Sequence, residues 1–195
     1  PVQFSNAEGY LEIMDLNPAD QISFNASKDK FLTKRSEFLM DGREIPKQLL
    51  KKELTDTTFD HKIILSQAEI GDEIGALFEV NPIYYDLDKS NIRPDAAAEL
   101  DKIVQVLKDN PNISIELGSH TDARASASYN LKLSQRRAES AVRYIIEHGI
   151  EAARIKAKGY GETQLINGCS DGVDCSEEAH QENRRTEFKI TDLND

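Results

Sequence analysis

The sequence predicts an α+β fold in which helices pack on a mixed sheet, preceded by a small β-rich module. From residue 81 onward, short segments of alternating hydrophobicity take turns with two long amphipathic patterns, in the order βαβαβ, loop, β. The first 80 residues instead contain mostly short strand-like runs bounded by turn residues. We therefore expect a β-rich module with a connector over residues 1–80 and a second domain over 81–195.

In the N-terminal part, the segment QISFNAS (21–27) alternates Ile22, Phe24 and Ala26 with polar residues, which is typical of a half-buried strand. Pro46 stands at the first position of a short helical pattern. The other elements predicted there are strands over 9–16, 30–40 and 61–66, an Asp-Gly turn at 41–42, a helix over 46–54 and a connector over 67–80.

In the C-terminal part, Pro94 opens a helical pattern that ends before Pro111, with Leu100, Ile103 and Leu107 on one face. A second helix over 129–149 places Leu133, Ala138, Ala141, Val142, Ile145 and Ile146 on one side and ends at Gly149. The strands predicted around these helices cover residues 82–88, 112–120, 154–162 and 183–190.

The charge balance argues against a nucleic-acid-binding protein. The formal net charge is −11 and the pI is near 4.9, whereas a protein that neutralises phosphates needs a basic surface. No apolar run approaches the roughly 18–20 residues that span a bilayer. Because the chain begins at Pro1 without a Met, we expect a processed chain or an excised piece of a larger protein.

Two cysteines lie close together, Cys169 and Cys175 in INGCSDGVDCSEE. They are too few for a tetrahedral zinc site, and His180 would supply only a third ligand. We predict a local disulfide, which stabilises the fold by about 2–3 kcal/mol in the chain-entropy model. A disulfide indicates an oxidising compartment such as the periplasm or cell exterior. Neither a metal nor a cofactor is expected.

The stretch GSHTDARASASYN contains the residue types of a Ser-His-Asp hydrolase, namely His120, Asp122, Ser126 and Ser128. They occupy one local loop and lack a G-x-S-x-G nucleophile elbow. A histidine at a strand end, followed by capping serines, is the simpler interpretation, and no enzyme is predicted.

Two other constellations are also weak. His120, His148 and His180 fall on three different elements without metal-binding spacing. Gly159 and Gly161 in GYGE lack the patterns of phosphate-binding loops, and a turn is the simplest interpretation.

Asp122 and Arg137 form the more informative pair. Arg137 lies in the early turns of its predicted helix, and its planar guanidinium suits a carboxylate. Asp122 at a strand end could face it across a shallow groove, so that the two residues would hold a zwitterionic amino-acid group. From the residues alone, a plain ion pair, or two charges that never meet, is the alternative.

Four separated motifs resemble the OmpA-like C-terminal domain of outer-membrane proteins, over about residues 82–191. In chain order they are YYDLDKSNIRPDAAAELDKIV, ELGSHTDARASASYNLKLSQRRAESAVRYI, GYGE and NRRTEF. The resemblance implies non-covalent binding of peptidoglycan through the diaminopimelate of its stem peptide, which anchors an outer-membrane or envelope complex to the cell wall. It further implies a periplasmic location, with tethering to the outer membrane through parts outside this chain.

The resemblance assigns roles residue by residue. Asp122 of the H-T-D motif would take the ammonium group of diaminopimelate and Arg137 of L-S-x-x-R-A its carboxylate, with Thr121, Asn130 and Asp88 nearby. Arg184 and Arg185 also match the family motif, in NRR. For these two residues a structural role is expected at least as much as a role in ligand binding. The chain departs from the family at Ala125, where a Gly is usual after D-x-R, so the loop could follow a different path.

Residues 1–80 weakly resemble the last strands of carboxypeptidase regulatory-like β-sandwich domains, which are non-catalytic. As an alternative function, the chain would be a protein–protein interaction module of an envelope or secretion assembly, and its expected partners would then be other envelope or outer-membrane proteins.

Overall fold

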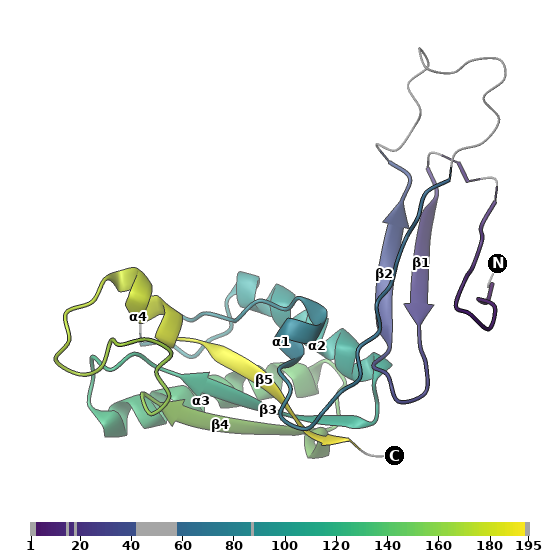
Figure 1. Cartoon of the computed structure of the whole chain (residues 1–195). Coiled ribbons are helices and arrows are strands. Elements are labelled where there is room, and N and C mark those ends of the chain that lie inside the picture. Colours follow the sequence, from purple (N-terminus) through teal and green to yellow (C-terminus); the bar gives the residue numbers. More distant parts are fainter. Residues whose placement is uncertain (1–2, 15, 18, 42–57, 87, 194–195) are drawn as a thin grey trace, which may run out of the picture. The chain divides into compact units, whose positions relative to one another are not determined.

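The computed structural model describes residues 3–193 apart from 15, 18, 42–57 and 87. The chain divides into two compact units, which are treated separately (Figure 1). The first comprises Pro1–Ala26 and Arg35–Ile64, and the second comprises Ser27–Lys34 and Leu65–Asp195. The predicted helix over 46–54 and Gly42 of the predicted turn lie outside the described residues.

The first unit contains a two-stranded sheet made of β1 (Gln21–Ala26) and β2 (Lys34–Leu39). Exposure alternates along β1, as predicted, because Phe24 turns toward the ring of His61 at a centroid distance of 5.2 Å. The strands predicted over 9–16 and 61–66 are wrong for the residues described there. Neither segment has a fully buried side chain among its described residues, and Tyr10, Met14 and Ile64 are 77%, 74% and 65% exposed.

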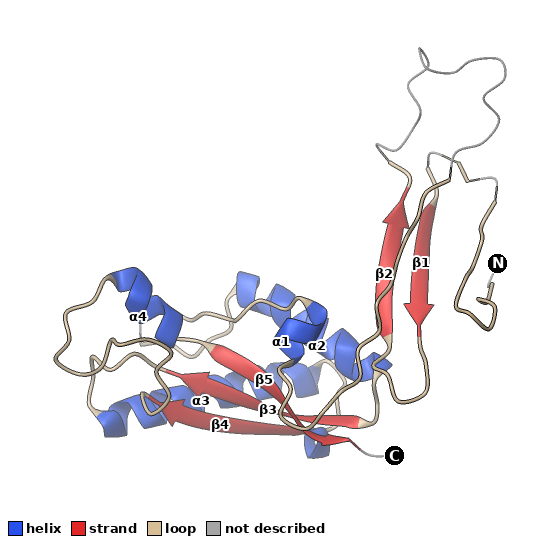
Figure 2. Ribbon diagram, viewed as in Figure 1, coloured by secondary structure: helices blue, strands red, loops and turns tan. Residues whose placement is uncertain are grey.

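The second unit is built on a three-stranded sheet in the order β4-β3-β5, as Figure 2 shows. Its strands are β3 (Ile113–His120), β4 (Ile155–Gly161) and β5 (Thr186–Leu193). Strand β3 pairs with β4 in parallel and with β5 antiparallel, so Leu117 lies between Ala157 and Phe188. This mixed sheet confirms the predicted fold class.

Two long helices complete the core of this unit, α2 (Pro94–Asp109) and α3 (Ala127–Glu147). Helix α3 packs along β4 and β3, and α2 packs on α3. The predicted apolar faces are confirmed except at Ile146, which is 36% exposed. The apolar side chains of these helices that are 0% exposed are Leu100, Ile103, Leu107, Ala138, Ala141 and Ile145.

The strand predicted over 82–88 is wrong for the residues described there. Ile83 and Tyr85 are buried, so the alternating pattern correctly marks one inward face. The backbone, however, bonds to a side chain and not to a neighbouring strand, since the carbonyl oxygen of Asp86 accepts a hydrogen bond from Arg137. The hydrophobic periodicity thus predicted which side chains are buried, but not the hydrogen-bond partner of the backbone.

Three further elements differ from the prediction. Helix α4 (Glu177–Asn183) was not predicted, and the η2 turn (Ala152–Arg154) precedes β4. Gly159 and Gly161, interpreted above as a turn, lie within β4.

The predicted connector contains α1 (Ile74–Phe78), which contacts β5. Ile74 is fully buried, and Glu73 forms an isolated antiparallel β-bridge with Lys189. Residues 65–80 thus pack with the second unit, while the domain boundary near residue 80 stays a prediction. No helix in the described part of the chain is long and apolar enough to cross a membrane.

Candidate functional site

The predicted site begins where β3 ends. His120 and Thr121 are fixed through their backbone amides, which donate to the carbonyl oxygens of Arg185 and Gly161, both at 2.9 Å. Thr121 is 2% exposed, and its Oγ1 has no hydrogen-bond partner within the described part of the chain. A buried hydroxyl without a partner is costly, so Thr121 Oγ1 has unused donor and acceptor capacity next in sequence to Asp122.

Asp122 is 8% exposed and is held by two arginines. Arg124 donates to its Oδ2 from Nε at 3.1 Å and Nη2 at 2.7 Å, and Arg184 donates from Nη1 at 2.7 Å. Burial raises the pKa of the Asp122 carboxyl, but these hydrogen bonds outweigh it and hold the pKa below its ordinary value. Asp122 is therefore an ionised, nearly buried carboxylate.

Arg137 is a buried cation, 2% exposed, whose described hydrogen bonds go to backbone oxygens. Nε donates to the carbonyl of Lys89 at 3.0 Å and Nη2 to that of Asp86 at 3.2 Å. The guanidinium also lies 5.0 Å from the centroid of the Tyr85 ring, whose hydroxyl donates to the Arg137 carbonyl. Burial lowers the pKa of Arg137, yet a guanidinium stays charged at any physiological pH.

Burial lowers the pKa of Arg137, and the Asp122 carboxylate opposes this lowering only weakly, after Tyr85 and Arg184 in order of effect. The described contacts of Asp122 are with Arg124 and Arg184, and those of Arg137 are with carbonyls and Tyr85. Asp122 and Arg137 are thus two opposite, nearly buried charges that do not form an ion pair with each other in the described structure.

Asn130 and Asp88 have more specific roles than the sequence indicated. Asn130 is buried, and its amide donates to the carbonyls of Asp122 and Ala125 at 3.0 and 3.1 Å, so it fixes the loop after β3. Asp88 is exposed, has a left-handed backbone (φ 58°) and accepts a hydrogen bond from the Tyr129 hydroxyl. Ala125 does not enter the left-handed region, so the missing glycine strains nothing here.

Glycines in β4 set how closely α3 approaches the sheet. A Cβ built on Gly159 would lie 2.3 Å from the backbone nitrogen of Gln135, and one on Gly161 would lie 3.0 Å from that of Leu131. The backbone amide of Gly161 also donates a hydrogen bond to the Ser134 Oγ at 2.8 Å. The absence of a side chain at these two positions therefore allows the close distance between α3 and β4, and this distance sets the position of Arg137 on α3.

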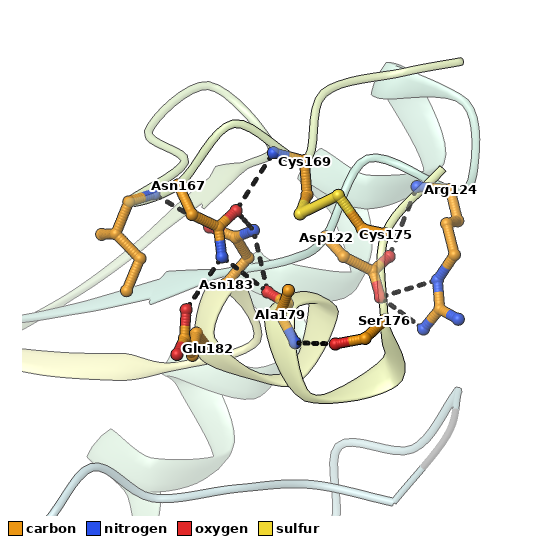
Figure 3. Close-up of a disulfide and its surroundings, with 10 residues drawn as sticks. Asp122, Arg124, Asn167, Cys169, Cys175, Ser176, Ala179, Glu182 and Asn183 are labelled. Carbon is orange, nitrogen blue, oxygen red and sulfur yellow. Dashed lines mark hydrogen bonds and ion pairs between the residues drawn. A yellow bond between two sulfur atoms is a disulfide. The ribbon is translucent and has the colours of Figure 1, made fainter. Parts of the chain in front are cut away.

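The disulfide between Cys169 and Cys175 is present and lies next to α4 (Figure 3). Ser176, which directly follows Cys175, caps α4 by accepting from the Ala179 amide at 3.3 Å. On the other side, Asn167 donates to the Ala179 carbonyl at 2.7 Å and accepts from the fully buried Asn183 at 2.7 Å. The loop and the helix thus form one cross-linked segment.

Helix α4 brings Glu177 to the site, which sequence reasoning missed. Glu177 accepts from Arg124 Nη1 at 2.7 Å and from Arg184 Nη2 at 2.6 Å. Two carboxylates and two guanidiniums, from Asp122, Glu177, Arg124 and Arg184, therefore form one network. The only sequence signal was the match of NRR to a family motif, because the partners lie up to 62 positions apart.

A second charged group adjoins the first at the end of β3. The Nε2 atom of His120 lies 3.5 Å from Oε2 of Glu187, while Arg185 Nε donates to Oε1 at 2.6 Å. The contact with His120 and the Arg185 guanidinium, working against burial, lower the pKa of Glu187 to about 2. The His120 ring stacks on that of Tyr160 with centroids 5.0 Å apart. In the described residues no group of three His, Cys, Asp or Glu side chains could hold a metal ion.

The fold and the site define a small α+β domain that gathers charged side chains where its central strand ends. The chain belongs to the OmpA family, whose model matches residues 84–179. The five residues predicted to bind ligand, Asp88, Thr121, Asp122, Asn130 and Arg137, lie inside the matched range, and Arg184 lies beyond it.

Two relatives and a solved structure each match between 55% and 60% of this chain. Photosystem I P700 chlorophyll a apoprotein A2 of Gloeobacter violaceus is 39% identical over 110 residues, which are 55% of this chain and 12% of that protein. The peptidoglycan-associated lipoprotein of Pseudomonas putida is 32% identical over 117 residues, 60% of this chain and 67% of that protein. The crystal structure of the peptidoglycan-associated lipoprotein from Burkholderia pseudomallei superimposes with a TM-score of 0.51 at 27% identity, covering 56% of this chain and 89% of that chain.

Proposed function

We propose that the second unit binds peptidoglycan non-covalently and anchors an envelope complex to the cell wall. Membership of the OmpA family supports this function, as do the names of the Pseudomonas and Burkholderia proteins, both peptidoglycan-associated lipoproteins. Binding of this kind needs recognition and no bond cleavage, so we propose that the domain is not an enzyme.

The ligand group that we propose is the diaminopimelate of the stem peptide. The side-chain end of this amino acid carries an ammonium and a carboxylate on one carbon, so a complementary site needs one anion and one cation close together. The observation that carries the proposal is that Asp122 and Arg137 are 8% and 2% exposed and oppositely charged, yet their described hydrogen bonds go to other groups and not to each other. Asp122 would take the ammonium and Arg137 the carboxylate.

The neighbouring residues would complete this cradle in different ways. Thr121 offers the buried hydroxyl that lacks a partner in the described structure. Asn130 supports the loop that carries Asp122, and Asp88 lies at the exposed rim beside Tyr129. We expect direct contact with ligand from Thr121 and an indirect, positioning contribution from Asn130.

Co-sedimentation with purified peptidoglycan tests the proposal. The wild-type chain should pellet with diaminopimelate-type peptidoglycan and much less with lysine-type peptidoglycan, whose third residue lacks the second carboxylate. Asp122→Asn keeps the shape of the side chain and removes its charge, and Arg137→Lys keeps the charge and removes the planar fork. Each variant should weaken binding about tenfold or more.

Thermal unfolding must accompany the binding measurements, because both residues are nearly buried. Arg143→Gln, at an exposed position further along α3, is the matched control and should pellet like wild type. If both site variants stay folded and pellet as well as wild type, the assignment of Asp122 and Arg137 to ligand binding is wrong.

We further propose that the chain resides in the periplasm, tethered to the outer membrane through parts outside it. The disulfide supports an oxidising compartment. The family match does not reach residues 1–83. For residues 1–80, the likeness to carboxypeptidase regulatory-like sandwiches stays a prediction, which the family match does not support.

A further inference from the structure

Arg124 spans the two carboxylates of the charge network. Its Nε and Nη2 bind Asp122, while its Nη1 binds Glu177 at 2.7 Å. The side chain is 45% exposed, whereas that of Asp122 is 11% exposed. Arg124 is thus the solvent-facing cation of the group, and it covers part of a carboxylate that is otherwise shielded from water.

Arg184 contacts the same two carboxylates from the interior. Its side chain is 13% exposed, and Gln181 provides a further acceptor. Both arginines direct their side-chain hydrogen bonds at Oδ2 of Asp122. Among the described residues, Oδ1 receives only the backbone amide of Arg124, at the long distance of 3.4 Å. Oδ1 is therefore the oxygen with acceptor capacity left for a donor from a ligand.

A ligand donor at this oxygen meets the charge of Arg124 at close range. A plain ammonium is repelled by the guanidinium, and at a separation of several ångströms near a protein surface the cost is on the order of a few-fold in affinity. An ammonium with a carboxylate on the same carbon carries no net charge, so its repulsion by Arg124 is offset by attraction of the carboxylate.

We propose that Arg124 is a specificity-determining residue, which lets the Asp122 site accept a zwitterionic amino-acid end and disfavours a simple amine. Glu177, which accepts from Arg124 Nη1 at 2.7 Å, neutralises part of the Arg124 charge and so weakens this preference. This inference rests on the proposed function and deepens it. Discrimination between diaminopimelate and lysine would then depend on Arg124, on the solvent side of the site, as well as on Arg137.

Calorimetric titration with two soluble stem peptides, identical except for diaminopimelate or lysine at the third position, tests this role. At low salt, Arg124→Ala should bind the lysine peptide about three- to fivefold more tightly and the diaminopimelate peptide within about twofold of wild type. Glu177→Gln should shift the preference the other way, toward diaminopimelate. A merely structural role of either residue would weaken both peptides together.

Arg143→Ala changes the net charge as Arg124→Ala does, at an exposed position on α3, and should leave the preference unchanged. Salt at about 0.5 M should shrink the differences between variants, since charges near the surface are screened. If the wild-type chain binds and both Arg124→Ala and Glu177→Gln keep its preference between the two peptides, this inference is wrong while the proposed function stands. Failure of the wild-type chain to bind either peptide or to pellet with peptidoglycan would overturn the proposed function with it.

Discussion

Two regions surround Asp122 and hold it in different ways. The scaffold, made of β3, α3 and β4, positions its groups by close packing and backbone hydrogen bonds, as in the buried Arg137 with its two carbonyl acceptors. The α4 segment, residues 164–185, relies on a disulfide, side-chain amides and exposed ion pairs. Adding a single methyl group to a tightly packed contact lowers the free energy of unfolding substantially, whereas changing an exposed ion pair alters it little. We infer that the scaffold sets the geometry of the site and that the α4 segment adjusts its charge.

The largest effect is expected from adding one methyl group to the scaffold. In Gly159→Ala the new Cβ would lie 2.3 Å from the nitrogen and 2.7 Å from the Cα of Gln135, both backbone atoms of α3. Helix α3 must move away from β4, and the free energy of unfolding should fall by about 3 kcal/mol. Urea unfolding measures this loss, and peptidoglycan pelleting should weaken as well because Arg137 moves with α3.

The matched control for this substitution lies in the α4 segment. A Cβ on Gly168 would meet no atom within 4 Å, and its backbone is not in the left-handed region. Gly168→Ala should therefore unfold within about 0.5 kcal/mol of wild type. Equal losses at the two glycines would break the distinction between a packed scaffold and a tolerant α4 segment.

A smaller effect is expected from removing the disulfide. Replacing Cys169 and Cys175 together by Ala opens a loop with a sequence separation of 6 and should lower the free energy of unfolding by about 2 kcal/mol. Because Ser176 and Asn167 tie this loop to α4, amide exchange should accelerate mainly within residues 164–185.

Wild-type protein with and without reductant provides the control for the disulfide variant, since both comparisons remove the same cross-link. Amides of β3 and of the second half of α3 should keep their protection in both. If those amides exchange faster by the same factor as the α4 segment, the two regions unfold as one unit and the comparison does not hold.

The elements that the sequence predicted well carry their signal locally. Helix α2 follows from Pro94 at its start and from Leu100, Ile103 and Leu107 on one face, and all three leucine and isoleucine side chains are fully buried. Helix α4 was missed because its sequence, EEAHQEN, has no apolar periodicity. It buries His180 and Asn183 instead, and Asn183 donates to Asn167, two residues before Cys169.

The site divides in the same way. Asp122 and Arg137 follow from short motifs, but which charges face Asp122 depends on how distant segments meet. Arg184 lies 62 positions away and Glu177 reaches the same network through Arg124. No pattern in a single sequence predicts that Asp122 is already occupied by two guanidiniums, because this depends on where the cross-linked segment places α4.

The smallest effect concerns Glu187, which joins the two regions by contacting His120 at the end of β3 and Arg185 at the end of the α4 segment. These contacts, the one with His120 first, lower the pKa of Glu187 from its ordinary value of 4.5 to about 2. A depressed carboxyl pKa stabilises the folded state above pH 4.5, and this stabilisation is lost as the pH falls through 2. Since the side chain is 31% exposed, we expect a contribution of about 1 kcal/mol.

Glu187→Gln isolates this contribution, because Asp122 also has a lowered pKa and destabilises the wild-type chain in acid in the same direction. The difference in unfolding free energy between wild type and Glu187→Gln should be constant from pH 7 to about 5 and shrink between pH 4.5 and 2. Glu147→Gln, at an exposed position near the end of α3, should show no such change. A constant difference down to pH 2 would mean that Glu187 does not link the scaffold and the α4 segment through its charge, and the two regions would then be coupled by packing alone.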